Sequence, residues 1–255
     1  MKLIYLHQYF NTPDMSGGTR SYEIARHMVA QGHEVHMVTS DRRNKANGWR
    51  ETVEEGIRVH WYPIEHSASR SYHRRIRAFF EFAWAATRRV ASLSGDLVFA
   101  TSTPLTIALP AVFAAKKHSV PMVFEVRDLW PEVPIAMGVL RSRIAIAAAR
   151  RLEQFAYRNA AHIVALAPGM KEGVVAAGYP ADQVTVIPNM CNPAHFRVDP
   201  AIGVEFRRAR DWLHARPLVV FTGALGVANG VDYLARLASV VWQRDPEIRF
   251  LIVGS

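Results

Sequence analysis

Residues 1–39, MKLIYLHQYFNTPDMSGGTRSYEIARHMVAQGHEVHMVT, decide the fold class of this chain. An apolar strand at residues 3–6 leads into a long polar loop, and a helix begins directly after Gly17-Gly18-Thr19. That helix ends near residue 32, where a second strand follows. Two glycines before a helix N-terminus allow bare backbone N–H groups to approach an anion. The stretch therefore predicts a βαβ unit with an anion-binding loop.

The position of these glycines also favours one class of enzyme over another. A dinucleotide fingerprint needs G-x-G-x-x-G directly after the strand. Here the loop is longer, and Gly17-Gly18 is followed by Arg20 and Glu23. The pattern indicates a nucleotide-sugar enzyme more than a nicotinamide-dependent oxidoreductase, which stays an alternative.

Strand-like and helix-like segments alternate along the chain, which predicts an α/β fold with a parallel sheet covered by helices. The expected strands occupy residues 2–6, 34–38, 57–61, 97–100, 122–126, 162–165 and 184–187. The expected helices occupy residues 20–30, 72–92, 106–117, 141–159 and 169–176. We expect this Rossmann-like sheet to form an N-terminal domain over residues 1–190.

A second alternating pattern starts after a segment rich in proline and asparagine, PNMCNPAHFRVDP at residues 188–200. We expect an interdomain crossing at residues 191–216 and the start of a second Rossmann-like domain at 217–255. The expected elements there are strand 218–221, helix 231–243 and strand 250–253. One βαβ unit does not make a stable two-layer domain alone, so we expect an incomplete second domain.

Composition bounds the partners and the compartment. The 255 residues are 50% hydrophobic and carry a formal net charge of +9. That charge suits nucleic acid or the cytoplasmic leaflet of a membrane, but no nucleic-acid recognition motif supports the first. The single cysteine, Cys191, excludes an intrachain disulfide framework and fits a reducing compartment. With no signal peptide or spanning segment visible, we expect a cytoplasmic protein.

A polar segment follows the strand expected at residues 122–126, in the sequence FEVRDLWPE (124–132). Ligands of open α/β sheets bind at the carboxyl ends of the strands. Burial of Arg127 beside Asp128 is costly unless the two pair or meet a charged ligand. These two residues are therefore candidate site residues, and a structural ion pair between them is the alternative. No histidine spacing predicts a metal site.

The segment SRSYHRRIRAFFEFAWAATRRVAS (69–92) is basic and aromatic. A helical wheel predicts an apolar stripe of Ile76, Phe79, Phe80, Ala83, Trp84, Thr87 and Val90, which we expect to pack on the sheet. The opposite side carries arginines and one aromatic ring, and it suits contact with anionic lipid. The candidate membrane-contact residues are Arg74, Arg75, Arg77, Phe82 and Arg89.

Together these motifs resemble the family 4 glycosyltransferases, whose GT-B architecture has two facing Rossmann-like domains. The nearest likeness is to the branch that builds bacterial capsule, colanic acid and O-antigen. The resemblance covers essentially the whole chain, and no single motif carries it. It rests on HQYF (7–10), GGTR (17–20) with YE (22–23), GHEV (32–35), RDLWPE (127–132), IPN (187–189) and FTG (221–223).

The resemblance implies retaining transfer of a sugar from a nucleotide-diphosphate donor, without a cofactor or a required metal. It implies catalytic roles for Asp128 and Arg127, which stand where many members carry a histidine. It also implies an acceptor that is lipid-linked or a polysaccharide, at the inner face of the cytoplasmic membrane. The implied donor- and acceptor-binding residues are Gly17, Gly18, Thr19, Glu132 and Gly223.

The family's E-x7-E donor segment is expected beyond Ser255, so we expect this chain alone to be inactive or nearly so. A non-catalytic membrane- or partner-binding module is the alternative from another class. The sequence names neither the donor sugar nor its nucleotide base, nor the acceptor.

Overall fold

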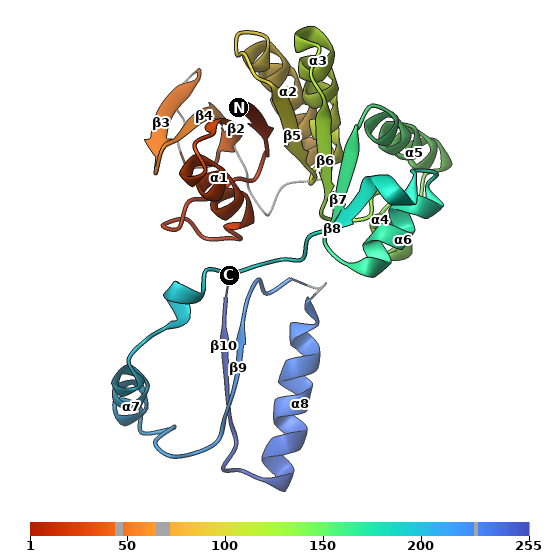
Figure 1. Cartoon of the computed structure of the whole chain (residues 1–255). Coiled ribbons are helices and arrows are strands. Elements are labelled where there is room, and N and C mark those ends of the chain that lie inside the picture. The colour runs from red at the N-terminus through yellow and green to blue at the C-terminus, as the bar shows by residue number, and fades with distance from the viewer. Residues whose placement is uncertain (44–47, 65–71, 227–228, 255) are drawn as a thin grey trace. The chain divides into compact units, whose positions relative to one another are not determined.

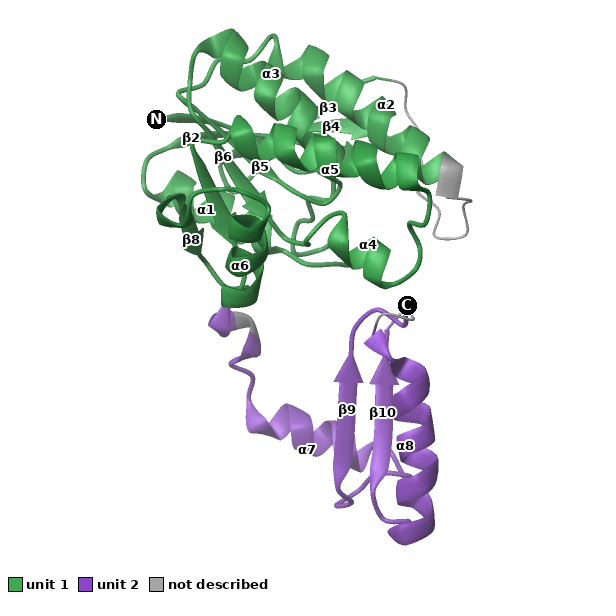
Figure 2. Ribbon diagram, turned by 90° about the vertical axis from the view of Figure 1, so that its right-hand side faces the viewer, with its two compact units in different colours: residues 1–191 green, residues 192–255 purple. Residues whose placement is uncertain are grey.

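The computed structural model describes residues 1–43, 48–64, 72–226 and 229–254 (Figure 1). It divides into two compact units, Met1–Cys191 and Asn192–Ser255, which are coloured separately in Figure 2. The division falls between Cys191 and Asn192, so the segment at 192–216, expected to be a crossing, belongs with the second unit. Each unit is described by itself below.

The first unit is built on one eight-stranded sheet with the strand order β3-β4-β2-β1-β5-β6-β7-β8. All neighbouring strands are parallel except β3 and β4, which form an antiparallel pair. The predicted α/β class with a Rossmann-like sheet is confirmed. The strands are β1 (Lys2–Leu6), β2 (Glu34–Asp41), β3 (Arg50–Glu54), β4 (Ile57–Pro63), β5 (Leu97–Thr101), β6 (Met122–Val126), β7 (His162–Ala165) and β8 (Val184–Val186).

Helices cover both faces of this sheet because alternate residues of its strands point in opposite directions. Ile4 and Leu6 of β1 belong to one buried cluster, and Leu3 and Tyr5 belong to the other. The helices are α1 (Arg20–Ala30), α2 (Tyr72–Val90), α3 (Ala108–His118), α4 (Glu132–Ala136), α5 (Arg143–Arg158) and α6 (Pro168–Ala176), with 3-10 turns η1 (Leu105–Ile107) and η2 (Ala181–Gln183).

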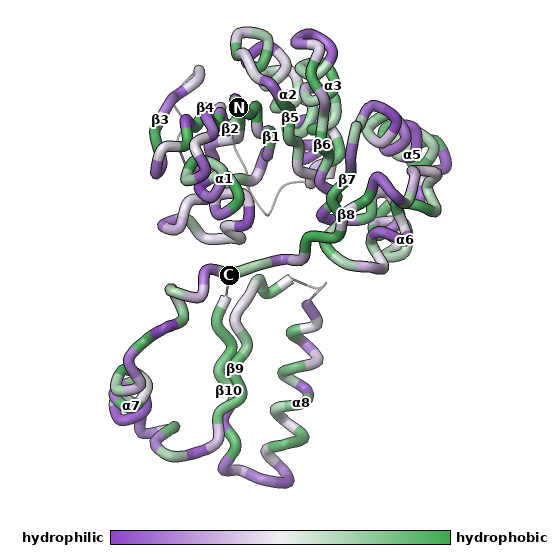
Figure 3. The backbone as a smooth tube through the Cα atoms, in the orientation of Figure 1, coloured by the Kyte–Doolittle hydropathy of each residue, from purple (hydrophilic) through white to green (hydrophobic). Residues whose placement is uncertain are grey.

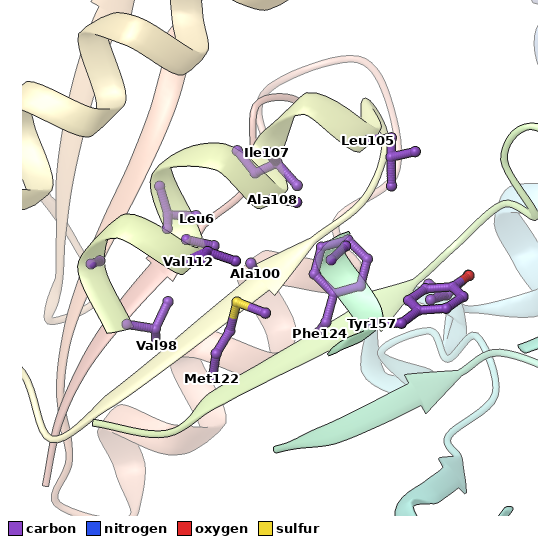
Figure 4. Packing of buried hydrophobic residues seen from close by; sticks show 14 of the residues in the cluster. Leu6, Val98, Ala100, Leu105, Ile107, Ala108, Val112, Met122, Phe124 and Tyr157 are labelled. Carbon is purple, nitrogen blue, oxygen red and sulfur yellow. The ribbon is translucent and has the colours of Figure 1, made fainter. Parts of the chain in front are cut away.

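The larger cluster joins the sheet to α2, α3 and α5. Figure 4 shows Val112 of α3 and Phe124 of β6 in this layer, with Tyr157 of α5 beside Phe124. The rings of Phe124 and Tyr157 meet edge to face at 6.4 Å between centroids. The smaller cluster lies under α1, where Tyr22 and Ala25 are buried.

The structure confirms burial of Ala83 and Val90 in the predicted stripe of α2 but corrects the position of its aromatic rings. Phe80 and Trp84, expected on the stripe that packs on the sheet, are 52% and 70% exposed. Phe82, expected at the surface, is only 1% exposed. The buried face runs through Ala78, Phe82, Ala86 and Val90, whose spacing of four places them on one side of a helix. The alanines allow α2 to pack closely against the neighbouring layer, whereas the helical-wheel prediction placed the large aromatic rings there.

Two elements of the first unit differ from the expected pattern. β3 pairs with β4 through a two-residue turn, Glu55-Gly56, in which both residues have positive φ (46° and 84°). Charged residues at both ends of β3 hide its alternation in the sequence. α4 is a five-residue helix in a segment that we expected to be a loop.

The second unit holds a two-stranded parallel sheet of β9 (Leu218–Thr222) and β10 (Arg249–Val253), which Figure 3 colours as largely hydrophobic. Its helices are α7 (Pro200–Arg208) and α8 (Val231–Arg244), with a 3-10 turn η3 (Pro193–Phe196). The segment expected to be only a crossing thus contains a helix. α7 begins where the Asp199 carboxylate accepts a hydrogen bond from the Ala201 backbone N–H at 2.8 Å, an N-cap that the Asp-Pro sequence supports.

Candidate functional site

A polar cavity of about 320 Å³ lies at the carboxyl-terminal edge of the eight-stranded sheet. Parallel strands end at one edge, so loops that are far apart in sequence meet there. The exits of β1, β5, β6, β7 and β8 all contribute. The lining residues are His7, Tyr9, Asn11, Gly18, Thr103, Arg127, Asp128, Leu166 and Asn189.

His7 is held at the bottom of this cavity. It follows β1 directly and is 2% exposed, and its Nδ1 lies 2.8 Å from the hydroxyl of Ser21 on α1. Arg127 places a guanidinium nitrogen 3.4 Å from Nε2 of the same ring. Burial, together with the charges of Arg127 and Arg42, holds the pKa of His7 well below its usual value. The imidazole is therefore neutral near pH 7, and one of its ring nitrogens can accept a hydrogen bond.

Asp128 and Arg127 leave β6 side by side but have different partners. The Thr103 hydroxyl donates to Asp128 Oδ2 at 2.6 Å, which fixes the exposed carboxylate from the β5 exit loop. The Arg127 backbone N–H donates to the Ser102 hydroxyl at 3.0 Å. In the described part of the chain no ion pair joins Arg127 to Asp128. The alternative of a structural pair between them is therefore not what the structure contains, and both side chains face the cavity.

The glycine loop approaches the cavity through its backbone. Gly17 has φ +129°, and a Cβ added there would lie 2.6 Å from Nδ2 of Asn11. Gly18 lines the cavity, and its carbonyl accepts a hydrogen bond from Asn11 at 3.2 Å. Thr19 stands at the N-cap of α1 without a side-chain capping bond. The loop therefore places the Gly18 backbone close to Arg127, and anion binding by this loop stays a prediction.

A buried ion pair between Arg20 of α1 and Glu125 of β6 was not recognised from the sequence. Arg20 donates to Glu125 Oε1 from Nε at 3.0 Å and from Nη2 at 2.9 Å, and the two side chains are 3% and 0% exposed. Arg20 also donates to the carbonyls of Pro188 and Ile187, at 2.5 and 2.9 Å. It thus fixes the chain after β8. A charged residue inside an apolar strand signals a buried partner, so Glu125 was the available clue.

Other expected site residues lie elsewhere. Glu132 is on α4, exposed, and 3.1 Å from Arg150, so it does not line the polar cavity. Gly223 follows β9 in the second unit, where its N–H donates to the Val253 carbonyl at 3.0 Å. In contrast, His7, Tyr9 and Asn189, which belong to motifs of the resemblance but were not candidate site residues, line the cavity together with Asn11. The signal that they carry is position, because each follows a strand of the sheet.

The candidate membrane-contact residues separate into two groups. Arg74, Arg75 and Arg77 are exposed, and within the described residues no carboxylate forms an ion pair with them. Phe82 is buried in the core, so its assignment to the membrane face is wrong. Arg89 turns inward to Glu51 and to His60 Nδ1 at 2.7 Å, and its guanidinium lies over the Trp49 ring. It is therefore unsuited to lipid contact.

The part of the chain that the structure describes contains no group of three histidine, cysteine or carboxylate side chains able to hold a metal ion.

None of the described helices combines the length and the apolar character needed to cross a bilayer.

Comparison with known proteins gives the cavity its context. The model of the glycosyl transferase 4-like domain matches residues 17–190, which include the glycine loop, Arg127, Asp128 and Asn189. The chain belongs to the glycosyl transferase 4-like family. No curated protein sequence matches it.

Solved structures share the fold of this glycosyl transferase 4-like chain. Anabaena HepE, crystallised with UDP and glucose, has 15% identity and a TM-score of 0.62 over 99% of this chain and 60% of its own. Sucrose-phosphate synthase from Thermosynechococcus elongatus has 14% identity and a TM-score of 0.73 over 100% and 62%. The catalytic domain of Arabidopsis thaliana starch synthase IV, bound to ADP and acarbose, has 13% identity and a TM-score of 0.68 over 99% of this chain and 68% of its own. The chain thus spans about three fifths of the length of the first two.

Proposed function

We propose that this glycosyl transferase 4-like chain is the acceptor-binding part of a retaining glycosyltransferase of bacterial surface polysaccharide synthesis. A nucleotide-diphosphate sugar is the donor, and the acceptor is a lipid-linked sugar or a polysaccharide. The observation that carries the proposal is the polar cavity, in which His7, Arg127 and Asp128 meet the glycine loop. The family match and the UDP-bound relatives support the donor class.

The residues of the polar cavity have different roles in sugar transfer. In the reaction the acceptor oxygen bonds to the anomeric carbon, the bond from that carbon to the nucleotide diphosphate breaks, and the hydroxyl proton passes to the departing diphosphate. Asp128, fixed by Thr103, accepts a hydrogen bond from the acceptor hydroxyl and orients it. Arg127 binds phosphate, since its guanidinium faces the same cavity as bare glycine backbone. The imidazole of His7 contacts the guanidinium of Arg127 and positions it.

The proposal also covers location and requirements. Arg74, Arg75 and Arg77, exposed on α2, suit the anionic surface of the inner face of the cytoplasmic membrane. The segment at 65–71 that leads into α2 lies outside the described residues, and so do the first residues of the basic stretch. We expect no metal requirement and retain Gly17, Thr19, Glu132 and Gly223 as proposed donor- or acceptor-side residues.

The test is a sugar-transfer assay with a panel of nucleotide sugars and a membrane lipid extract. It is run on this chain and on a longer form that spans the full length of the solved relatives. We expect transfer by the longer form, and Asp128→Asn in that form should lower it at least about tenfold, since a neutral amide accepts a weaker hydrogen bond from the hydroxyl than a carboxylate does. Asp182→Asn, an exposed aspartate outside the cavity, is the matched control and should leave transfer unchanged.

Two outcomes contradict the proposal. Equal transfer by the two variants would remove Asp128 from the site. Binding to anionic vesicles without any binding of nucleotide sugar or transfer, in either form, would favour the non-catalytic membrane-binding alternative.

A further inference from the structure

A second cavity, of about 500 Å³, lies in the first unit among α2, η1, α4 and α5. Its walls are mainly apolar and include Ile76 and Phe79 of α2, Leu105 of η1, Trp130 before α4, and Ala149 and Leu152 of α5. This volume is within the ~300–1,000 Å³ typical of ligand pockets. We call it the α2–α5 cavity.

The α2–α5 cavity adjoins the polar cavity through two shared lining residues. Tyr9 and Thr103 line both, and Thr103 is the residue that holds Asp128 in place. A ligand whose polar end meets Asp128 therefore has an apolar compartment directly beside it. The proposed function described above assigns no role to the α2–α5 cavity.

The lining favours a hydrocarbon over a peptide. A peptide brings N–H and C=O groups that need partners when buried, and leaving them unpaired is costly. Most side chains of this lining offer no hydrogen bond, whereas a hydrocarbon chain requires none. Two large apolar side chains of the lining, Phe80 and Val139, are also 52% and 58% exposed, so the apolar surface reaches the outside.

Charge near the rim indicates what the hydrocarbon carries. Arg75 is the charged residue of this lining among those described, and its side chain is exposed next to Arg74. Arg127 faces the adjoining polar cavity. A negative group between the apolar and the polar compartments would thus meet positive charge from both sides.

We propose that the α2–α5 cavity binds the hydrocarbon chain of a single-chain lipid phosphate, and that this lipid phosphate carries the acceptor sugar. The proposal rests on the proposed function for the role of that lipid as acceptor. The chain lies between α2 and α5, its phosphate lies between Arg75 and Arg127, and the group to be glycosylated reaches Asp128.

Binding of alkyl phosphates tests the cavity directly. Isothermal titration of the 255-residue chain uses inorganic phosphate and then octyl, decyl and dodecyl phosphate, each below its critical micelle concentration. Each methylene that enters an apolar site is worth roughly fourfold in affinity. We expect affinity to rise about sixteenfold per two carbons until the cavity is full, with inorganic phosphate the weakest ligand.

Two variants of α5 separate filling of the cavity from change of the helix. Ala149→Phe places a ring in the cavity and should abolish the dependence on chain length while leaving affinity for inorganic phosphate unchanged. Ala147→Phe lies on the same helix, is exposed and does not line the cavity, so the dependence should remain. The series on the unaltered chain gives the result even if one variant fails to fold.

Three results would overturn the proposal. The first is an affinity that does not depend on chain length, and the second is an equal effect of the two variants on that dependence. The third is that Ala149→Phe loses binding to phosphatidylglycerol vesicles to the same extent as it loses binding to dodecyl phosphate. The last would assign the cavity to a two-chain bilayer lipid. The readout needs no donor, so it is independent of sugar transfer. Chain-length dependence without transfer in the longer form would refute only the proposed function; transfer to a soluble acceptor without that dependence would refute only the cavity assignment.

Discussion

Arg20→Met tests the buried ion pair that joins α1 to β6. Arg20 donates twice to Glu125, and both side chains are nearly inaccessible, at 3% and 0% exposed. Methionine preserves much of the volume but leaves the Glu125 carboxylate charged in an apolar core, where the Thr101 hydroxyl still donates to it at 3.0 Å. Removing one partner of such a pair costs about 3–5 kcal/mol. We expect a loss of that size in the free energy of unfolding of the first unit.

The same helix supplies a matched control. Arg26 lies 2.7 Å from Glu23, but its side chain is 41% exposed and its partner is one helical turn away. Exposed pairs of this kind contribute less than about 1 kcal/mol. Arg26→Met should therefore change stability several times less than Arg20→Met, although both remove one arginine from α1.

Urea unfolding read by hydrogen exchange in peptides from β1 and β6 is the assay, because these strands report the first unit alone. The double variant Arg20→Met/Glu125→Leu removes both charges and should be more stable than Arg20→Met alone. A loss in Arg20→Met no larger than in Arg26→Met would refute the reasoning. So would a double variant that loses the sum of the two single changes.

The remaining predictions concern the glycine loop and His7. Gly17→Ala should cost about 1–3 kcal/mol in urea unfolding, because φ is +129° and the new Cβ would lie 2.6 Å from the Asn11 amide. Gly18→Ala, whose Cβ would come no closer than 3.8 Å to Arg127, should cost less, and equal losses would contradict this. His7 has a pKa lowered by burial, so below about pH 6.5 the unfolded chain takes up a proton that the folded chain refuses. Stability should fall on acidification by roughly 1–1.5 kcal/mol per pH unit, and His7→Gln should flatten that slope.

Much of the first unit was predictable because its periodicity is strong. β1 and β6 are short apolar runs bounded by polar loops, and α1 begins after a glycine pair and ends at Ala30, just before Gly32, so local sequence sets their ends. The face of α2 was not predictable in the same way. Tertiary packing buries the face of α2 that carries Phe82 and several alanines, rather than the face with more aromatic rings. A helical wheel does not contain that information.

The candidate site was predictable only in part. Asp128 and Arg127 are found because charged residues after a strand mark the ligand edge of a parallel sheet. His7 and Asn189 depend on which strands are neighbours, because β1, β6 and β8 meet at that edge only in the folded sheet. The partner of Glu125 lies 105 positions away, and spacing in sequence does not reveal such a pair.

The β3–β4 hairpin has a consequence for how this sheet behaves in a concentrated solution. A parallel sheet that ended at β4 would offer seven residues, Ile57–Pro63, as an unpaired ladder for a strand of another molecule. β3 covers that ladder with a shorter strand bearing Arg50, Glu51 and Glu54, charges that oppose further pairing. At the opposite end the sheet stops at β8, which is only three residues long. Both margins thus discourage edge-to-edge aggregation, one by charge and the other by length.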